Sequence, residues 1–130
     1  MNHLYNIFIK LIDKIVLPIL EIFSNKIKRF KINRVSLINT IANEIKVEGD
    51  SLWFHAASLG EYEMAVPLIK RVKEKHSFTI ILTFFSESGF QVKNRIKEVD
   101  YTFYLPLDTK ENAKNFINII RPKMAIFIRS

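Results

Sequence analysis

The chain has 130 residues, of which 48% are hydrophobic and 25% charged, and it carries a formal net charge of +7. This length suits one domain with a substantial core, and the composition excludes a disordered or low-complexity chain. There is no cysteine, which excludes a disulfide framework, a thiolate metal site and a thiol nucleophile. The three histidines, His3, His55 and His76, are scattered along the chain and do not predict a metal cluster.

The basic excess lies in the first 34 residues. They hold seven Lys or Arg and two acidic residues, whereas residues 35–130 hold thirteen and eleven. On a helical wheel the polar side chains share one stripe about 100° wide, which only Leu17 interrupts, and leave a broad apolar face. These polar residues are His3, Asn6, Lys10, Asp13, Lys14 and Glu21, and five cations follow within residues 26–34. We therefore predict that residues 1–34 form an amphipathic helix and a basic segment that associate with an anionic membrane surface.

Other roles for this arm are less consistent with its residues. Its charges disfavour a membrane-spanning helix, and the interrupted apolar stretch without a small-residue cleavage site disfavours a secretory signal. Binding of nucleic acid would leave the large aliphatic side chains exposed without a function. The remaining alternative is a helix that packs on its own domain, followed by a solvated basic loop.

From residue 50 onwards, apolar strands alternate with amphipathic helices. After weak helical character over 35–44 and a turn at 48–50, we predict strands at 52–57, 78–85, 101–105 and 124–128, and helices at 61–75, 87–98 and 109–120. Such alternation is typical of right-handed βαβ units. We therefore predict an α/β fold, with a parallel-sheet, Rossmann-like domain over residues 35–130. Pro67 predicts either a kinked helix or a late start to its regular part.

The first strand-to-helix corner carries a candidate general base. Parallel sheets bind ligands beyond the carboxyl ends of their strands. Here the small-residue turn containing Ser58 and Gly60 leads to Glu61 at the start of the predicted helix. A carboxylate there can accept a proton from a substrate hydroxyl, or it can simply complement the helix dipole. Glu63 competes for the same role, and composition does not separate the two.

The second and third corners offer weaker candidates. Ser86, Ser88 and Gly89 provide hydroxyls and close backbone approach, so they either cradle an anion or merely cap a helix. In the third corner, Asp108 or Thr109 is expected to cap the next helix, and the alternative for Asp108 is a position in the lining of the cleft. His55 is expected to be partly buried with its hydrogen bonds satisfied.

Residues 53–61, Trp-Phe-His-Ala-Ala-Ser-Leu-Gly-Glu, resemble the signature of the 3-deoxy-D-manno-octulosonic acid (Kdo) transferases. The other matching segments occur in the same order as in that family. They are the hydrophobic start before this signature and, after it, the corner at residues 83–89, the Tyr-Leu-Pro-Leu-Asp stretch at 104–108 and the segment 121–128. The resemblance covers essentially the whole chain. It implies the amino-terminal, acceptor-side half of a GT-B glycosyltransferase.

The resemblance also implies a reaction and a location. It implies inverting transfer of Kdo from CMP-Kdo to the lipid A precursor (lipid IVA), with Glu61 as general base and no metal or cofactor. Acceptor-binding roles are implied for Ser58, Gly60, Ser86, Ser88 and Gly89. The location implied is the cytoplasmic face of the inner membrane. The family's carboxy-terminal, donor-binding domain is missing from these residues, so we expect the 130 residues to be inactive alone.

Two alternatives are of other functional classes. One is a receiver-like binding module, for which Glu61, Glu87 and Asp108 would be an imperfect acidic cluster. The other is a membrane-surface adaptor whose α/β domain binds protein without catalysis.

Overall fold

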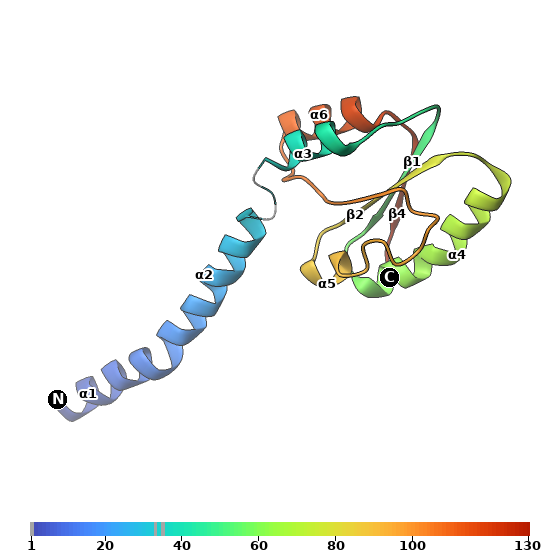
Figure 1. Ribbon diagram of the computed structural model, residues 1–130. Helices are drawn as coiled ribbons and strands as arrows, with labels where there is room; N and C mark the ends of the chain where they lie inside the picture. Colours follow the sequence, from blue (N-terminus) through green and yellow to red (C-terminus); the bar gives the residue numbers. More distant parts are fainter. Residues whose placement is uncertain (1, 33, 35) are drawn as a thin grey trace. The chain divides into compact units, whose positions relative to one another are not determined.

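The computed structural model describes residues 2–32, 34 and 36–130, and the chain divides into two compact units, Met1–Val35 and Ser36–Ser130 (Figure 1). The first unit contains α1 (Asn2–Leu11), the π-helix η1 (Ile12–Val16) and α2 (Leu17–Ile32). The second contains α3 (Leu37–Glu44), β1 (Ser51–Ala56), α4 (Leu59–Lys75), β2 (Thr79–Phe84), α5 (Glu87–Phe90), β3 (Tyr101–Tyr104), α6 (Lys110–Ile120) and β4 (Pro122–Ile128).

The first unit is helical through most of the basic segment as well as the apolar stretch. Pro18 has no N–H, so the Lys14 carbonyl lacks an α-helical partner, and the wider π-turn of η1 lies at this point. Large apolar side chains are exposed along the unit, among them Phe8 at 61% and Phe23 at 60%. Within the described residues, no helix combines the length and the apolar character needed to cross a membrane.

The second unit confirms the predicted α/β fold. Its four strands form one sheet in the order β3-β2-β1-β4, and every neighbouring pair is parallel. Strand residues alternate between the two faces of a sheet. Phe54 of β1 packs under α4 with Leu82 and Phe84, whereas Trp53 packs with Phe103 and α6 on the opposite face. Figure 1 shows α4 and α5 on one side of the sheet and α3 and α6 on the other. Burial on both faces explains why the two central strands, β1 and β2, are almost continuously apolar, whereas the edge strand β4 is largely exposed.

Several predicted boundaries moved, and one predicted helix was wrong. The helix expected over 87–98 ends at Phe90, and turns and bends follow it. Asn94 has a φ of 64°, which a right-handed helix does not accommodate, and hydrogen bonds such as Arg95 N–H to the Val92 carbonyl are one residue tighter than in an α-helix. The segment therefore turns back towards β3.

The other helices agree more closely with the sequence. α4 begins at Leu59 and continues through Pro67, which lies on its exposed side, where water can replace the hydrogen bond lost at the Glu63 carbonyl. Thr109 caps α6, since its hydroxyl accepts from Asn112 N–H at 3.1 Å. The predicted start of α3 at Val35 lies outside the described residues.

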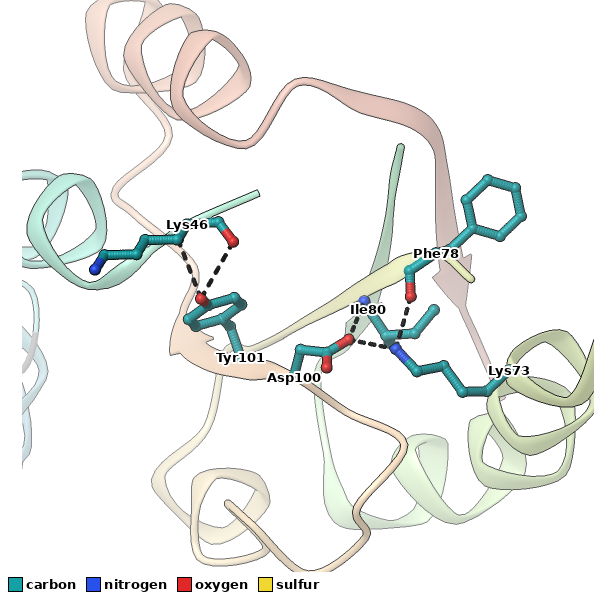
Figure 2. Close-up of polar contacts among 6 residues, drawn as sticks. All are labelled: Lys46, Lys73, Phe78, Ile80, Asp100 and Tyr101. Atoms are coloured by element: carbon teal, nitrogen blue, oxygen red, sulfur yellow. Dashed lines mark hydrogen bonds and ion pairs between the residues drawn. The ribbon is translucent and has the colours of Figure 1, made fainter. Parts of the chain in front are cut away.

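Asp100 makes several contacts at the end of the sheet opposite the candidate site. One of its carboxylate oxygens accepts from Lys73 Nζ at 2.7 Å and from Ile80 N–H at 2.8 Å, as Figure 2 shows. Lys73 also donates to the Phe78 carbonyl, and the neighbouring Tyr101 hydroxyl bonds to both backbone groups of Lys46. These contacts link α4, β2 and the start of β3.

Replacing Asp100 by alanine is expected to lower the free energy of unfolding by about 1–2 kcal/mol. The change leaves Lys73 and Ile80 N–H without their shared acceptor, and partial exposure of the pair reduces the loss. Urea unfolding at constant m-value measures this difference. The matched control is Glu74→Ala, which removes the exposed Arg71–Glu74 ion pair and is expected to cost below about 0.5 kcal/mol. Equal losses in the two variants would contradict the role given to Asp100.

Candidate functional site

The carboxyl ends of β1, β2 and β3 meet at one edge of the sheet. Ser86 N–H donates to the Ala57 carbonyl at 3.2 Å, which joins the first corner to the second. Leu105 N–H donates to the Phe84 carbonyl at 2.8 Å, which joins the second to the third. The three corners that the sequence suggested are therefore neighbours in space.

Glu61 is held in place at this edge by backbone donors. One carboxylate oxygen, Oε2, accepts from Ala57 N–H at 2.7 Å, a distance typical of a charge-assisted hydrogen bond. The other, Oε1, lies 3.4 Å from Ser130 N. Ser58 is the N-cap of α4, and its hydroxyl accepts from Glu61 N–H at 3.4 Å. Ser58 and Glu61 thus resemble a capping box in which the glutamate reaches the residue before the cap.

This geometry is compatible with both readings of Glu61. The half-buried carboxylate complements the dipole of α4. Each carboxylate oxygen has a further lone pair, so the group can still accept a proton from a bound hydroxyl. Glu63, in contrast, is 54% exposed and its carboxylate lies 3.1 Å from Arg95 Nη1. The structure therefore separates the two glutamates: Glu61 belongs to the strand edge, and Glu63 to a surface ion pair.

The two glycines of the predicted site have different surroundings. A methyl group at Gly60 would meet nothing within 4 Å, so this exposed first turn of α4 is open to an approaching molecule. A methyl group at Gly89 would overlap the ring of Phe84. Gly89 is therefore required for the packing of α5 on the core, whatever else it does.

The hydroxyls of the second corner bind one another. Ser86 caps α5 by accepting from Gly89 N–H at 3.3 Å, and its oxygen lies 3.1 Å from that of Ser88. One donor of the proposed anion cradle, Gly89 N–H, is thus already engaged. The serine hydroxyls remain the groups at this corner that can turn towards a ligand.

A buried polar chain runs beside the edge. Thr83 Oγ1 accepts from Trp53 Nε1 at 2.8 Å and lies 2.9 Å from His55 Nδ1. Burial lowers the pKa of His55 below its ordinary value, although the Glu61 charge and a hydrogen bond with the Thr83 backbone act in the opposite direction. At neutral pH the imidazole is therefore uncharged. The sequence pattern gave Thr83 no role, and the available clue was a hydroxyl near the carboxyl end of a mostly apolar buried strand.

The described residues include no group of three or more His, Cys, Asp or Glu side chains that could hold a metal ion. Glu87 lies at the start of α5, and Asp108 is exposed in the loop before α6, where Thr109 rather than Asp108 is the cap. The acidic trio considered for a receiver-like module therefore does not form such a group.

Comparison with known families identifies the family of the chain. Residues 27–130 match the family model described as 3-deoxy-D-manno-octulosonic-acid transferase (kdotransferase). The chain belongs to the Kdo transferase family. The match includes the whole α/β unit and the last part of α2.

Individual Kdo transferases agree with this assignment. The enzyme of Aquifex aeolicus is 34% identical over 79 residues, which are 60% of this chain and 22% of the relative. That of Haemophilus influenzae is 25% identical over 128 residues, 97% of this chain and 30% of the relative. That of Chlamydia trachomatis serovar D is 34% identical over 86 residues, 64% of this chain and 20% of the relative. The chain thus spans between a fifth and a third of the curated relatives it matches.

The two glycines of this Kdo transferase domain give a paired test. Gly89→Ala is expected to lower the free energy of unfolding by about 1–3 kcal/mol, because Phe84 must move to admit the methyl group. Gly60→Ala is expected to be neutral or to stabilise by up to about 1 kcal/mol, because alanine favours the helix and the space is open. Urea unfolding of both variants measures the difference. A neutral Gly89→Ala would contradict the packing role.

Proposed function

We propose that this chain is the acceptor-side domain of an enzyme that transfers Kdo from CMP-Kdo to the lipid A precursor, lipid IVA, in lipopolysaccharide biosynthesis. The observation that carries the proposal is the Glu61 carboxylate, fixed by Ala57 N–H at the carboxyl edge of a Kdo transferase domain. Ligands of open parallel sheets bind at this edge.

In the proposed reaction, Glu61 takes the proton of an acceptor hydroxyl. The hydroxyl oxygen forms a bond to the anomeric carbon of Kdo while the bond from that carbon to CMP breaks, and CMP leaves with the electron pair. Base and leaving group lie on opposite faces of the sugar, so the anomeric configuration inverts, as in inverting glycosidases with a sugar hydroxyl in place of water. The reaction as proposed requires no metal or cofactor.

The acceptor is proposed to contact both corners. Gly60 leaves open space above the first turn of α4, and the exposed hydroxyl of Ser58 borders it. Ser86 and Ser88 offer hydroxyls from the neighbouring corner, while Gly89 shapes that corner by allowing Phe84 to pack. These five residues supply neutral hydrogen-bonding groups and room for a sugar, and CMP-Kdo is proposed to bind mainly to a carboxy-terminal domain.

The enzyme is proposed to work on the cytoplasmic face of the inner membrane. The exposed apolar side chains of α1 and α2, together with the cations Lys26, Lys28 and Arg29, support attachment to an anionic lipid surface. Nucleic acid is not a proposed partner. A membrane adaptor without catalysis would share the attachment but would not need Glu61.

The intact enzyme, incubated with CMP-Kdo and lipid IVA, is expected to release CMP and to give a lipid product heavier by one or more Kdo residues. Mass spectrometry of the lipid measures the transfer, and the anomeric configuration of the product reports inversion. If CMP release and lipid mass stay at the level of an enzyme-free control, the proposal is wrong and the adaptor becomes the better explanation.

A further inference from the structure

A cavity lies on the α6 side of the sheet, at the carboxyl ends of the strands. It measures about 510 Å³ and opens between β1, the loop from β3 to α6, α6 itself and the end of β4. Its walls are mainly aromatic and aliphatic, and include Trp53, Phe85, Leu107, Phe116, Ile117 and Phe127. Its volume lies within the range of small-molecule sites, which are usually apolar concavities.

The rim of this cavity exposes large apolar side chains to water. Phe85 is 50% exposed, Leu107 43%, Ile117 42% and Phe127 56%. They come from β4, α6 and two different loops, so folding of the α/β unit brings them together. Apolar groups gathered around a concavity in this way are typical of a binding site rather than of a solvated surface.

The cavity adjoins the Glu61 corner through the backbone. Phe85 on its rim is followed directly by Ser86, whose N–H donates to the Ala57 carbonyl, and Ala57 N–H in turn donates to Glu61. On the other side of the rim, the Phe127 ring lies 5.6 Å from the His55 ring, centroid to centroid. The cavity and Glu61 therefore lie at the same end of the sheet, which is the placement that a ligand contacting both would require.

The lining disfavours anionic and strongly polar ligands. Asp108 is the one charged residue among the lining residues, all of which the structure describes, and as an anion it repels phosphate and carboxylate groups. Trp53 Nε1 already donates to Thr83. A sugar, a nucleoside or a phosphate would thus find few partners there, whereas a hydrocarbon chain needs none.

We propose that this cavity binds one acyl chain of the lipid acceptor, and so orients the acceptor hydroxyl towards Glu61. The inference rests on the proposed function for the identity of the acceptor, but the cavity's preference for a hydrocarbon chain can be measured without any transfer reaction.

Trp53 is the single tryptophan of the chain and lines the cavity, so its fluorescence reports on the occupant. The probe is dodecyl maltoside brominated on its alkyl chain, because bromine quenches indole fluorescence on contact. It is kept below its critical micelle concentration. We expect saturable quenching in the 130-residue chain. Unbrominated dodecyl maltoside should compete with the probe.

Ala113→Phe fills the cavity from α6 and is expected to weaken binding of the probe at least about tenfold. This is the loss of affinity expected when ~2 methylenes of the probe can no longer be buried. Asn118→Phe adds the same side chain at an exposed position of α6 outside the lining and is expected to leave the affinity unchanged. If Ala113→Phe does not fold by circular dichroism, Leu107→Ser on the loop provides the second test, with weaker binding expected. Absence of saturable quenching, or equal binding in the cavity and control variants, would overturn the inference.

The same variants separate this inference from the proposed function. In the intact enzyme, Ala113→Phe is expected to raise the KM for lipid IVA and to leave the KM for a deacylated acceptor unchanged. An enzyme that transfers Kdo while Trp53 is not quenched refutes the acyl-chain site alone. Quenching in a protein that transfers no Kdo supports the cavity and refutes the reaction.

Discussion

Replacing Glu61 by glutamine is expected to lower the kcat of Kdo transfer by about 10²–10⁴-fold, the usual contribution of a positioned general base. The amide has nearly the same shape, and its oxygen can still accept from Ala57 N–H, so the corner should keep its geometry. It cannot take up the proton of the acceptor hydroxyl. The KM for the acceptor is therefore expected to change little. Initial rates of CMP release with lipid IVA as acceptor measure both parameters in the intact enzyme.

The matched control is Glu63→Gln, which removes the same charge two residues away. Glu63 lies in an exposed pair with Arg95, so its substitution is expected to leave transfer unchanged and to cost less than about 1 kcal/mol. Urea unfolding of both variants tests the capping role separately, because loss of the charge at the start of α4 is expected to cost about 0.3–1 kcal/mol. Full activity of Glu61→Gln with reduced stability would show that Glu61 is a cap and not the base.

The fold could be predicted largely because its two central strands, β1 and β2, are buried on both faces. An apolar run such as residues 78–85 is hard to place anywhere but inside a covered parallel sheet, and β2 lies within it. The helix expected over 87–98 was wrong for a local reason that the apolar spacing of Val92 and Ile96 concealed. Asn94 adopts a left-handed conformation, and the periodicity of neighbouring residues does not reveal where a chain will use one.

The candidate site was predictable where its chemistry is local. The spacing of Ser58 and Glu61 indicates a helix start, and both side chains lie at the mouth of α4. Gly89 was ambiguous because its requirement is tertiary: the ring that fills the space comes from Phe84, in the preceding strand. Thr83 links Trp53 and His55 through the register of β1 on β2, which pairs His55 with Thr83 and which the sequence does not specify.

Replacing three of the five cations within residues 26–34 is expected to weaken binding to anionic membranes about 100-fold. The variant carries Lys26→Gln, Lys28→Gln and Arg29→Gln, and glutamine keeps the helix propensity of α2. Each basic residue near an anionic leaflet contributes about 1 kcal/mol, so the loss is about 3 kcal/mol in total. Cosedimentation with vesicles of phosphatidylcholine and phosphatidylglycerol measures the partition coefficient.

A second triple variant separates a local basic surface from net charge. Lys97→Gln, Lys110→Gln and Lys114→Gln remove the same three charges from exposed positions of the α/β unit, and are expected to change the partition coefficient little. Added salt should weaken membrane binding of the wild-type chain more than that of the variant lacking Lys26, Lys28 and Arg29, since the variant has fewer charges to be screened. Residual binding of that variant then measures the exposed apolar side chains, and Phe8→Ser with Phe23→Ser should remove it. Equal losses in both triple variants would mean that overall charge, rather than the amino-terminal helix, brings this domain to the membrane.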